Sequence, residues 1–213
     1  MDHPGSAKRI YIHALSVRIF HWLNAVAMVM MIMSGWRIYN ASPLYDWISF
    51  PNYLTIGGWL GGALQWHFAA MWLFVINLLV YLLIGIFSGH FRNSMLPVTP
   101  GGVVGDLGKA LRGKLPHDIG VYNSVQKISY IGVLLLMVLI FVSGLCVWKP
   151  VQFQSIAALM GGYEGARIVH FICMSLICAF IVMHLVLVAI VPSTFIPMIT
   201  GWAKTKKGTG HVA

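Results

Sequence analysis

Charged residues are scarce in this sequence. Only 9% of its 213 residues are Asp, Glu, Lys or Arg, and 59% are hydrophobic, whereas soluble domains carry roughly 25% charged residues. Acidic residues are rarest, with five Asp and Glu in all. The composition therefore excludes an ordinary soluble domain and predicts an integral membrane protein with no carboxylate-rich site.

Cysteine is also rare, and its spacing excludes one cofactor. The three cysteines form no CxxC or CxxCH pattern, which rules out the covalent attachment of a c-type haem. Cys146, Cys173 and Cys178 all lie in apolar runs. We expect them to be buried packing residues.

Four apolar runs approach the length of about 20 residues that a membrane-spanning helix needs. They cover about residues 17–38, 66–88, 126–148 and 167–191, and an interfacial tail follows at 192–213. The second run can begin earlier, because the residues before it carry few charges. We expect an all-α, four-helix transmembrane bundle that forms one membrane-embedded domain over residues 1–213. The first span is expected to be a retained anchor, because its apolar run is too continuous for a cleaved signal.

Basic residues predict the orientation of the bundle. Most of the 14 Lys and Arg residues lie before the first span, between the second and third, and after the fourth. The other two loops hold only Arg37, Lys149 and Arg167. Lys and Arg are concentrated in cytoplasmic loops, so both termini are expected in the cytoplasm of a bacterium, with the chain in its inner membrane. The net charge of +9 therefore reflects orientation and lipid contact, and nucleic acid is not an expected partner.

Four of the nine histidines stand inside or at the start of spans: His21, His67, His170 and His184. Ionisable residues in spans are costly and usually functional, although any one of these taken singly could be a hydrogen-bonded core residue. The remaining five are expected to be solvated or interfacial, with His90 at a span edge as a weaker candidate for a cofactor contact. They are His3, His13, His90, His117 and His211.

The spacing sorts the four histidines into two pairs. His170 and His184 are 14 residues apart, a rise of about 21 Å with nearly whole turns, so they share a helix face near opposite membrane surfaces. In antiparallel spans, His21 lies at the depth of His184 and His67 at the depth of His170. Each pair joins two helices at one depth.

Two imidazoles from different helices at one depth are typical axial ligands of a b-type haem. The pattern predicts two haems, with iron ligands His21 and His184 on the cytoplasmic side and His67 and His170 on the periplasmic side. Zinc would need three or four ligands at one depth. A proton relay would use Asp or Glu within a span, and the spans have none.

Small and basic residues complete the expected haem environment. Gly35 and Gly144 lie near the outer ends of their spans and can make room for the outer haem, although small residues also serve simple helix packing. Four basic residues at the span edges are candidates for propionate contacts, with interfacial anchoring as the equal alternative: Arg18, Arg37, Lys127 and Arg167. The sequence shows no internal repeat of fixed period.

The chain resembles the prokaryotic cytochrome b561 superfamily, which includes dihaem cytochrome b subunits of nickel-iron hydrogenases, formate dehydrogenases and thiosulfate reductases. The matching motifs are RIFHW around His21, WHF around His67, YNSVQKISY at 122–130, the His170 and His184 pair, and PMITG at 197–201. The resemblance implies ligands on spans one, two and four. It also implies a quinone site near His21 and His184, and a partner that docks at the periplasmic face.

We therefore expect a membrane cytochrome b with two protohaem groups that carries electrons between the quinone pool and a periplasmic redox subunit, of the molybdenum oxidoreductase or hydrogenase type. No catalytic nucleophile or acid–base set is visible. A stand-alone superoxide:quinone oxidoreductase of the same fold is the alternative, and a haem-free transporter or structural subunit is the rival from another class. Membrane lipid is a further expected partner, and a homo-oligomer stays open.

Overall fold

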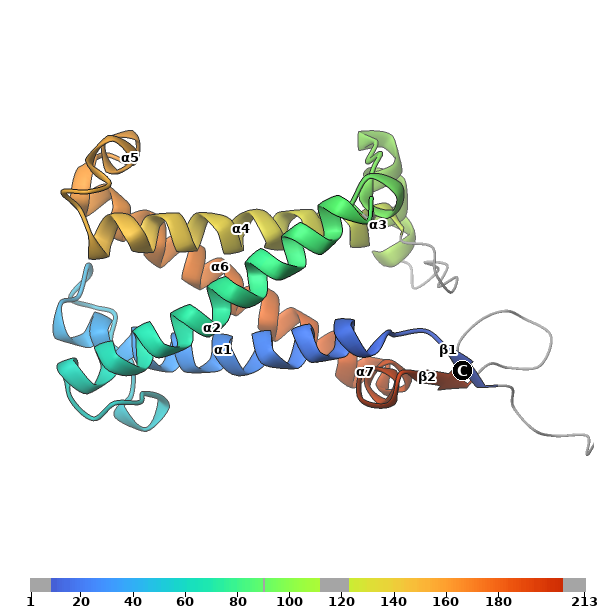
Figure 1. Cartoon of the computed structure of the whole chain (residues 1–213), viewed down its shortest axis with the longest axis horizontal. Helices are drawn as coiled ribbons and strands as arrows, with labels where there is room; N and C mark the ends of the chain where they lie inside the picture. The colour runs from blue at the N-terminus through green and yellow to red at the C-terminus, as the bar shows by residue number, and fades with distance from the viewer. Residues whose placement is uncertain (1–8, 90, 112–122, 205–213) are drawn as a thin grey trace, which may run out of the picture. The chain divides into compact units, whose positions relative to one another are not determined.

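The four expected spans are four long helices in the structure, a computed structural model that describes residues 9–89, 91–111 and 123–204. They are α1 (Leu15–Ala41), α2 (Leu60–Phe87), α4 (Ser124–Trp148) and α6 (Gly162–Ile190) (Figure 1). All four are long and apolar enough to cross a membrane. His3, His90, His117 and His211 lie outside the described residues.

All four helices begin earlier than the predicted spans, and two of them by five residues or more. Helix α2 starts at Leu60 instead of 66, and α6 starts at Gly162 instead of 167. In the first turns of α6, Arg167 and Glu164 form an ion pair of 2.9 Å. A span defined by the absence of charge must stop at this pair, whereas a helix accepts oppositely charged residues three apart on its surface.

The chain divides into two compact units. Unit 2 comprises Phe20–Leu82 and Val133–Ile181. Unit 1 comprises the described residues within Met1–Ile19, Leu83–Gly132 and Val182–Ala213. Each long helix therefore passes from one unit into the other.

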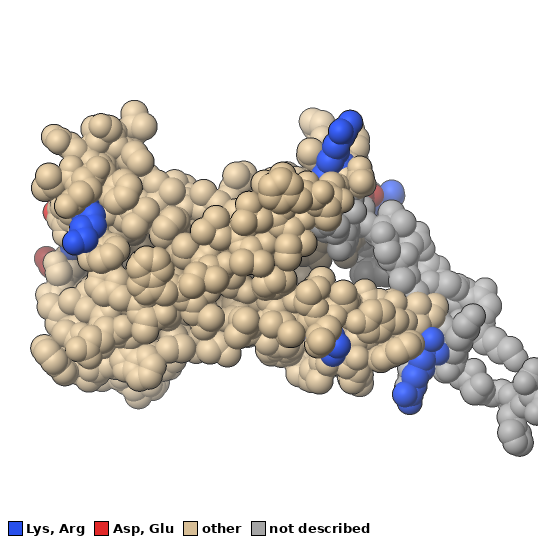
Figure 2. Space-filling model, in the orientation of Figure 1, with Lys and Arg blue, Asp and Glu red and all other residues tan. Residues whose placement is uncertain are grey.

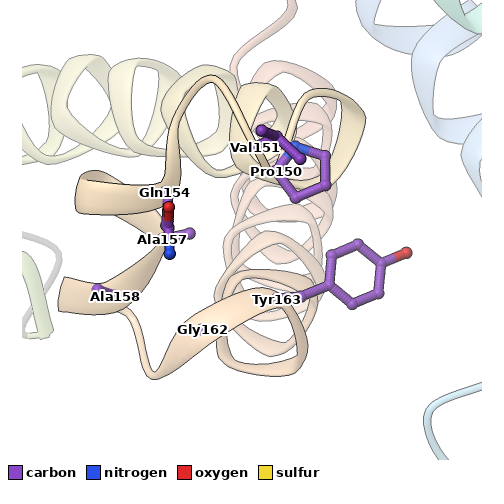
Figure 3. A pocket seen from close by; sticks show the side chains of 7 residues that line it. All are labelled: Pro150, Val151, Gln154, Ala157, Ala158, Gly162 and Tyr163. Carbon is purple, nitrogen blue, oxygen red and sulfur yellow. The ribbon is translucent and has the colours of Figure 1, made fainter.

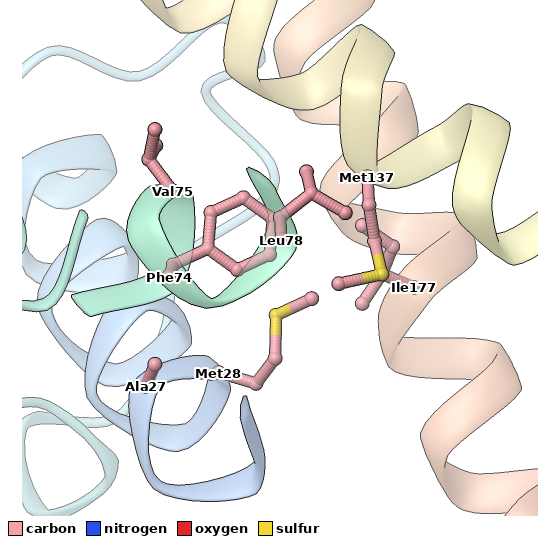
Figure 4. Packing of buried hydrophobic residues seen from close by; sticks show 7 residues of the cluster. All are labelled: Ala27, Met28, Phe74, Val75, Leu78, Met137 and Ile177. Carbon is pink, nitrogen blue, oxygen red and sulfur yellow. The ribbon is translucent and has the colours of Figure 1, made fainter. Parts of the chain in front are cut away.

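All four long helices contribute to one hydrophobic core in unit 2. Figure 4 shows its seven buried residues, which are Ala27, Met28, Phe74, Val75, Leu78, Met137 and Ile177. Each is at most 9% exposed. Dispersion contacts of this kind hold helices together in a bilayer, where lipid tails are as apolar as the side chains themselves.

The connections at one end of unit 2 are closely packed. After α1, the chain folds back so that Trp36 stacks on Phe50 with ring centroids 4.7 Å apart. The Asn40 side chain accepts a hydrogen bond from the Phe50 amide (2.9 Å) and donates one to its carbonyl (2.7 Å). The short helices η1 (Asn52–Leu54) and α5 (Gln154–Leu159) complete these connections.

Unit 1 contains short elements that the sequence did not predict. Strands β1 (Arg9–Tyr11) and β2 (Trp202–Lys204) pair antiparallel, so the described part of the chain departs from the all-α prediction at this small sheet (Figure 1). Gly201 has a φ of 86° next to β2, and a Cβ there would lie 2.7 Å from the Tyr11 ring. Other elements are η2 (Phe91–Met95), α3 (Pro100–Leu111), η3 (Pro192–Thr194) and α7 (Phe195–Thr200).

The outward faces of the long helices are apolar. Ile76 of α2 is 59% exposed and Val182 of α6 is 62% exposed. On the face shown in Figure 2, Lys and Arg atoms lie toward helix ends and connections, and the middle stretches of the helices are without them. Exposed apolar helix surface with internally satisfied backbone groups is what a bilayer requires.

Candidate functional site

Two of the four predicted ligands, His67 and His170, lie close together inside unit 2. His67 comes from α2 and His170 from α6, and their ring centroids are 6.5 Å apart with the ring planes inclined by 64°. Both helices also contribute residues to the core described above. The structure therefore brings together the pair that the sequence assigned to the periplasmic side.

Each of these rings is held at Nδ1 by a serine from a third or fourth helix. Ser34 Oγ of α1 lies 3.0 Å from His67 Nδ1, and Ser143 Oγ of α4 lies 3.1 Å from His170 Nδ1. Both serines are completely buried. The two histidines and their two serines thus draw on all four long helices.

The hydrogen-bond partners determine the tautomer of both rings. The Ile140 carbonyl lies 3.0 Å from His170 Nδ1. A carbonyl oxygen can only accept, so Nδ1 of His170 must carry the hydrogen. Ser34, which faces His67 Nδ1, has the Met30 carbonyl at 2.6 Å as an acceptor for its own hydrogen. A hydroxyl that donates there offers only a lone pair to His67, whose Nδ1 then carries the hydrogen as well. In a neutral imidazole the other nitrogen, Nε2, then bears the lone pair that binds a metal.

Two glycines lie against the same rings. A Cβ on Gly35 would stand 3.4 Å from His67 Cε1, and a Cβ on Gly144 would stand 3.1 Å from His170 Cε1. Each glycine directly follows the serine that holds the ring. A Ser-Gly dipeptide therefore lies against each histidine. The serine contacts Nδ1 of the ring, and the glycine leaves space for the ring beside its helix.

This arrangement fits a metal in a cofactor that supplies most of the metal's ligands. A metal lies about 2 Å from an imidazole nitrogen, and the 6.5 Å between the two ring centroids would leave room for one metal atom bound by both His67 and His170. A metal held by protein alone needs three or four ligands, and no three His, Cys, Asp or Glu residues gather at one place within residues 9–89, 91–111 and 123–204.

The other two predicted ligands lie in different units. His21 is on α1 in unit 2, with its ring edge-on to Trp22 at 5.3 Å between centroids. His184 is on α6 in unit 1. Their assignment as a ligand pair stays a prediction.

Three of the four basic residues proposed for propionate contacts are engaged with protein groups. Arg37 donates to Asn52 Oδ1 (2.7 Å), and Arg167 donates to Glu164 (2.9 Å) and to the Ser42 carbonyl (2.7 Å). Arg18 donates to the Ile199 carbonyl. These bonds tie helix ends to their connecting segments. Lys127 lies in the first turn of α4, and all four assignments stay predictions.

A separate hollow of about 440 Å³ lies beside α5 and the start of α6 (Figure 3). Its lining residues are Pro150, Val151, Gln154, Ala157, Ala158, Gly162 and Tyr163. None of the four span histidines lines it. The hollow is therefore not part of the histidine site.

The sequence profile of the family described as prokaryotic cytochrome b561 matches residues 12–201. The chain belongs to the prokaryotic cytochrome b561 family. Membership implies b-type haem and transmembrane electron transfer, in agreement with the four apolar helices. This prokaryotic cytochrome b561 is accordingly a multi-pass membrane protein.

One relative is similar to almost the whole of this cytochrome b561. It is YedZ1 from Azospira oryzae, whose name designates it a candidate protein-methionine-sulfoxide reductase subunit. The two are 50% identical over 197 residues, which cover 92% of this chain and 99% of the relative.

The sequence predicted His67, His170 and the two glycines, but not the two serines. A serine in an apolar helix commonly bonds to the carbonyl one turn earlier, so nothing marked Ser34 or Ser143 as different. The signal that would have identified them is the Ser-Gly dipeptide, which occurs once in each of two spans that lack histidine near their outer ends.

Proposed function

We propose that this cytochrome b561 carries electrons across the bacterial inner membrane through two b haems, each bound by two histidines. His67 and His170 would bind the haem iron in unit 2, and His21 and His184 would bind the second. The observation that supports this most directly is the His67 and His170 pair, because both rings keep Nδ1 occupied and Nε2 available.

When bound, haem supplies the one-electron ferric–ferrous couple. The chain's own residues supply everything around it. The histidines would provide nitrogen ligands to the iron, the serines would orient the histidines, and the apolar core would lower the local dielectric and keep water away.

The second pair is supported by sequence spacing. His184 lies 14 residues beyond His170 on the same helix, so the two share a face about 21 Å apart. Two redox centres on one face at this separation form a path for electrons across most of the bilayer core, which is about 30 Å thick.

We propose quinone and a periplasmic redox subunit as the two electron partners. The name of the Azospira oryzae relative supports a partner of the sulfoxide reductase class. Orientation is supported by the concentration of Lys and Arg around the termini and the loop between α2 and α4. Quinone is supported by the family resemblance alone.

The decisive experiment is a pyridine haemochrome assay on protein purified from native-like membranes, with protein determined by amino-acid analysis. Two protohaem groups per chain are expected, with a low-spin absorption band in the reduced state. No protohaem would overturn the function. One protohaem would overturn the two-centre path and leave one histidine pair unexplained.

The partner is tested separately in right-side-out membrane vesicles, whose outer surface is the periplasmic face. Addition of quinol should reduce the haems, and a purified sulfoxide-reductase subunit should then reoxidise them. Failure to reoxidise with that subunit, while haem reduction by quinol proceeds, would overturn the proposed partner. Rapid haem reduction by superoxide alone would favour the stand-alone oxidoreductase instead.

A further inference from the structure

The surroundings of His67 and His170 are built twice in the same way. In each case a Ser-Gly dipeptide from a neighbouring helix faces the ring, and the carbonyl three residues before the serine lies within hydrogen-bonding distance of the serine Oγ. For His67 these groups are Ser34, Gly35 and the Met31 carbonyl. For His170 they are Ser143, Gly144 and the Ile140 carbonyl.

Both serine hydroxyls have a backbone carbonyl of their own helix as an acceptor. Ser34 Oγ donates to the Met30 carbonyl at 2.6 Å, and Ser143 Oγ donates to the Ile140 carbonyl at 3.1 Å. A hydroxyl that has used its hydrogen can offer only a lone pair to its other neighbour. Each serine oxygen is therefore placed to accept from the Nδ1–H group of its histidine, and His170 shares that hydrogen between Ser143 Oγ at 3.1 Å and the Ile140 carbonyl at 3.0 Å.

A hydrogen bond accepted from Nδ1–H has an electronic effect at the far side of the ring. It pushes electron density toward Nε2, which raises the basicity of that nitrogen as a metal ligand. A more basic axial ligand stabilises ferric over ferrous iron, so hydrogen bonds around a haem help set its reduction potential. Burial strengthens this effect, because both hydroxyls lie in a low-dielectric interior.

We propose that Ser34 and Ser143 are a matched pair of positioning residues that fix the orientation of His67 and His170 and lower the reduction potential of the haem those histidines bind. The proposal rests on the proposed function, since it needs a haem at this pair. It assigns to two serines a role that neither packing nor helix formation requires.

Simple packing does not account for these serines. Alanine would fill nearly the same volume and has the higher helix propensity. Ser175 on α6 makes the same kind of bond to the carbonyl one turn earlier, Phe171 at 2.9 Å, but stands at an exposed position. Ser175 is therefore a matched control for the loss of a helix-bonded hydroxyl.

The test is a redox titration with electron paramagnetic resonance on four variants: Ser34→Ala, Ser143→Ala, the double variant and Ser175→Ala. In the first two we expect the midpoint potential of one haem to rise and its largest ferric g value to shift. The second haem should be unchanged. The double variant should shift further in the same direction, while Ser175→Ala should match the wild type.

Each outcome separates the positioning role from the proposed function. If the wild type holds two haems but the potentials and g values of all four variants match it, the positioning role is overturned and the function stands. If both haems shift equally, the effect is not local and the assignment is wrong. If the wild type binds no haem, the proposed function fails.

Discussion

At the scale of single residues, the proposed function rests on histidines because a neutral imidazole can use its two nitrogens for different tasks. In His67 and His170, Nδ1 lies within hydrogen-bonding distance of a serine, which leaves Nε2 for the proposed iron. Without such partners, a buried imidazole would rotate and lose the ligand geometry. The distance between the two rings therefore depends on residues other than the histidines.

Replacing either of these histidines should cost one haem. His170→Ala and His67→Ala are each expected to bind one haem per chain instead of two, because one axial nitrogen is lost and a single imidazole holds the iron weakly. His184→Ala should lose the other haem. Haem content and the reduced spectrum give the answer, and His13→Ala, outside the spans, should keep two.

A methyl group added beside the rings should affect the two glycines differently. At Gly144 it would lie 3.1 Å from the His170 ring, but at Gly35 it would lie 3.4 Å from the His67 ring. Gly144→Ala should therefore lower haem occupancy more than Gly35→Ala. Each change should stabilise its helix by up to about 1 kcal/mol, so a lower haem content would not reflect unfolding.

Gly132→Ala is the control for this prediction, because it lies on the same helix α4 and its added methyl group would meet nothing within 4 Å. Haem-to-protein ratios of all three variants can be compared in one preparation. A Gly144→Ala protein with full haem content would contradict the close approach of this helix to His170.

At the scale of elements, the site is formed by two helical hairpins, α1 with α2 and α4 with α6. Corresponding residues have the same spacing in both. Ser34 follows His21 by 13 residues, and Ser143 follows Tyr130 by 13. His184 follows His170 by 14 residues, and Tyr81 follows His67 by 14. Each hairpin thus supplies one of the two ligands proposed for the second haem. The corresponding position in the opposite hairpin holds a tyrosine: Tyr130 corresponds to His21, and Tyr81 corresponds to His184.

A cross-helix hydrogen bond joins the two helices of the first hairpin. Asn77 of α2 is 7% exposed, and its Nδ2 donates to the Phe20 carbonyl of α1 at 3.0 Å. Its Oδ1 has no hydrogen-bond partner among the described residues. The bond therefore ties α2 to the turn of α1 that precedes His21, but leaves one amide oxygen unsatisfied.

Asn77→Leu is expected to change the free energy of unfolding by less than about 1 kcal/mol, since single hydrogen bonds between membrane helices average roughly 0.6 kcal/mol. Relief of the unsatisfied oxygen should offset part of the loss. Asn77→Ala should be less stable than Asn77→Leu because it leaves a cavity. Unfolding in mixed micelles measures both, and a loss above about 2 kcal/mol for Asn77→Leu would show a further role for this amide.

The contact between α3 and α4 should weaken at low pH. Asp106 accepts a hydrogen bond from the Ser124 amide (2.9 Å) and pairs with Lys109 (3.2 Å). These donors hold the pKa of the Asp106 carboxyl below its usual range, with the Ser124 amide as the main cause. A carboxyl with a lowered pKa binds fewer protons in the folded state, so its contribution is present above about pH 4 and is lost below it.

Hydrogen exchange in the segment 100–111, followed between pH 6 and pH 3 and corrected for intrinsic rates, should show this loss of protection. Asp106→Asn should remove the pH dependence, because an amide does not titrate in this range. Asp46→Asn, in the connection after α1, should retain it. The effect is readily isolated, because the chain has only five acidic residues. Unchanged protection of the wild type at pH 3 would refute the role of Asp106.

At the scale of the whole molecule, the charge distribution predicts the orientation of the protein in the membrane. We predict both termini on the cytoplasmic side, because most of the 14 Lys and Arg residues lie in the segments that would share it. Alkaline phosphatase should be inactive when fused after residue 204 and active when inserted near Asn52. The opposite activities would reverse the assignment of the two histidine pairs to the two membrane surfaces.

The sequence predicted the helices well and their ends less well. Long apolar runs need no tertiary information, because the bilayer alone requires that their backbone bonds be made within each helix. The start of α6 at Gly162 was missed, since it depends on a local ion pair. The pairing of β1 with β2 was missed because strands of three residues 190 or more positions apart leave no periodic signal.

Composition and spacing were sufficient to indicate a four-span membrane protein and to select four histidines, because charge is expelled from lipid and helical geometry relates residues 14 apart. Neither could reveal that Ser34 and Ser143 lie within hydrogen-bonding distance of histidines 33 and 27 residues away. Such contacts depend on the rotation of each helix about its own axis. That rotation is set when four irregular surfaces pack together, and no single segment contains it.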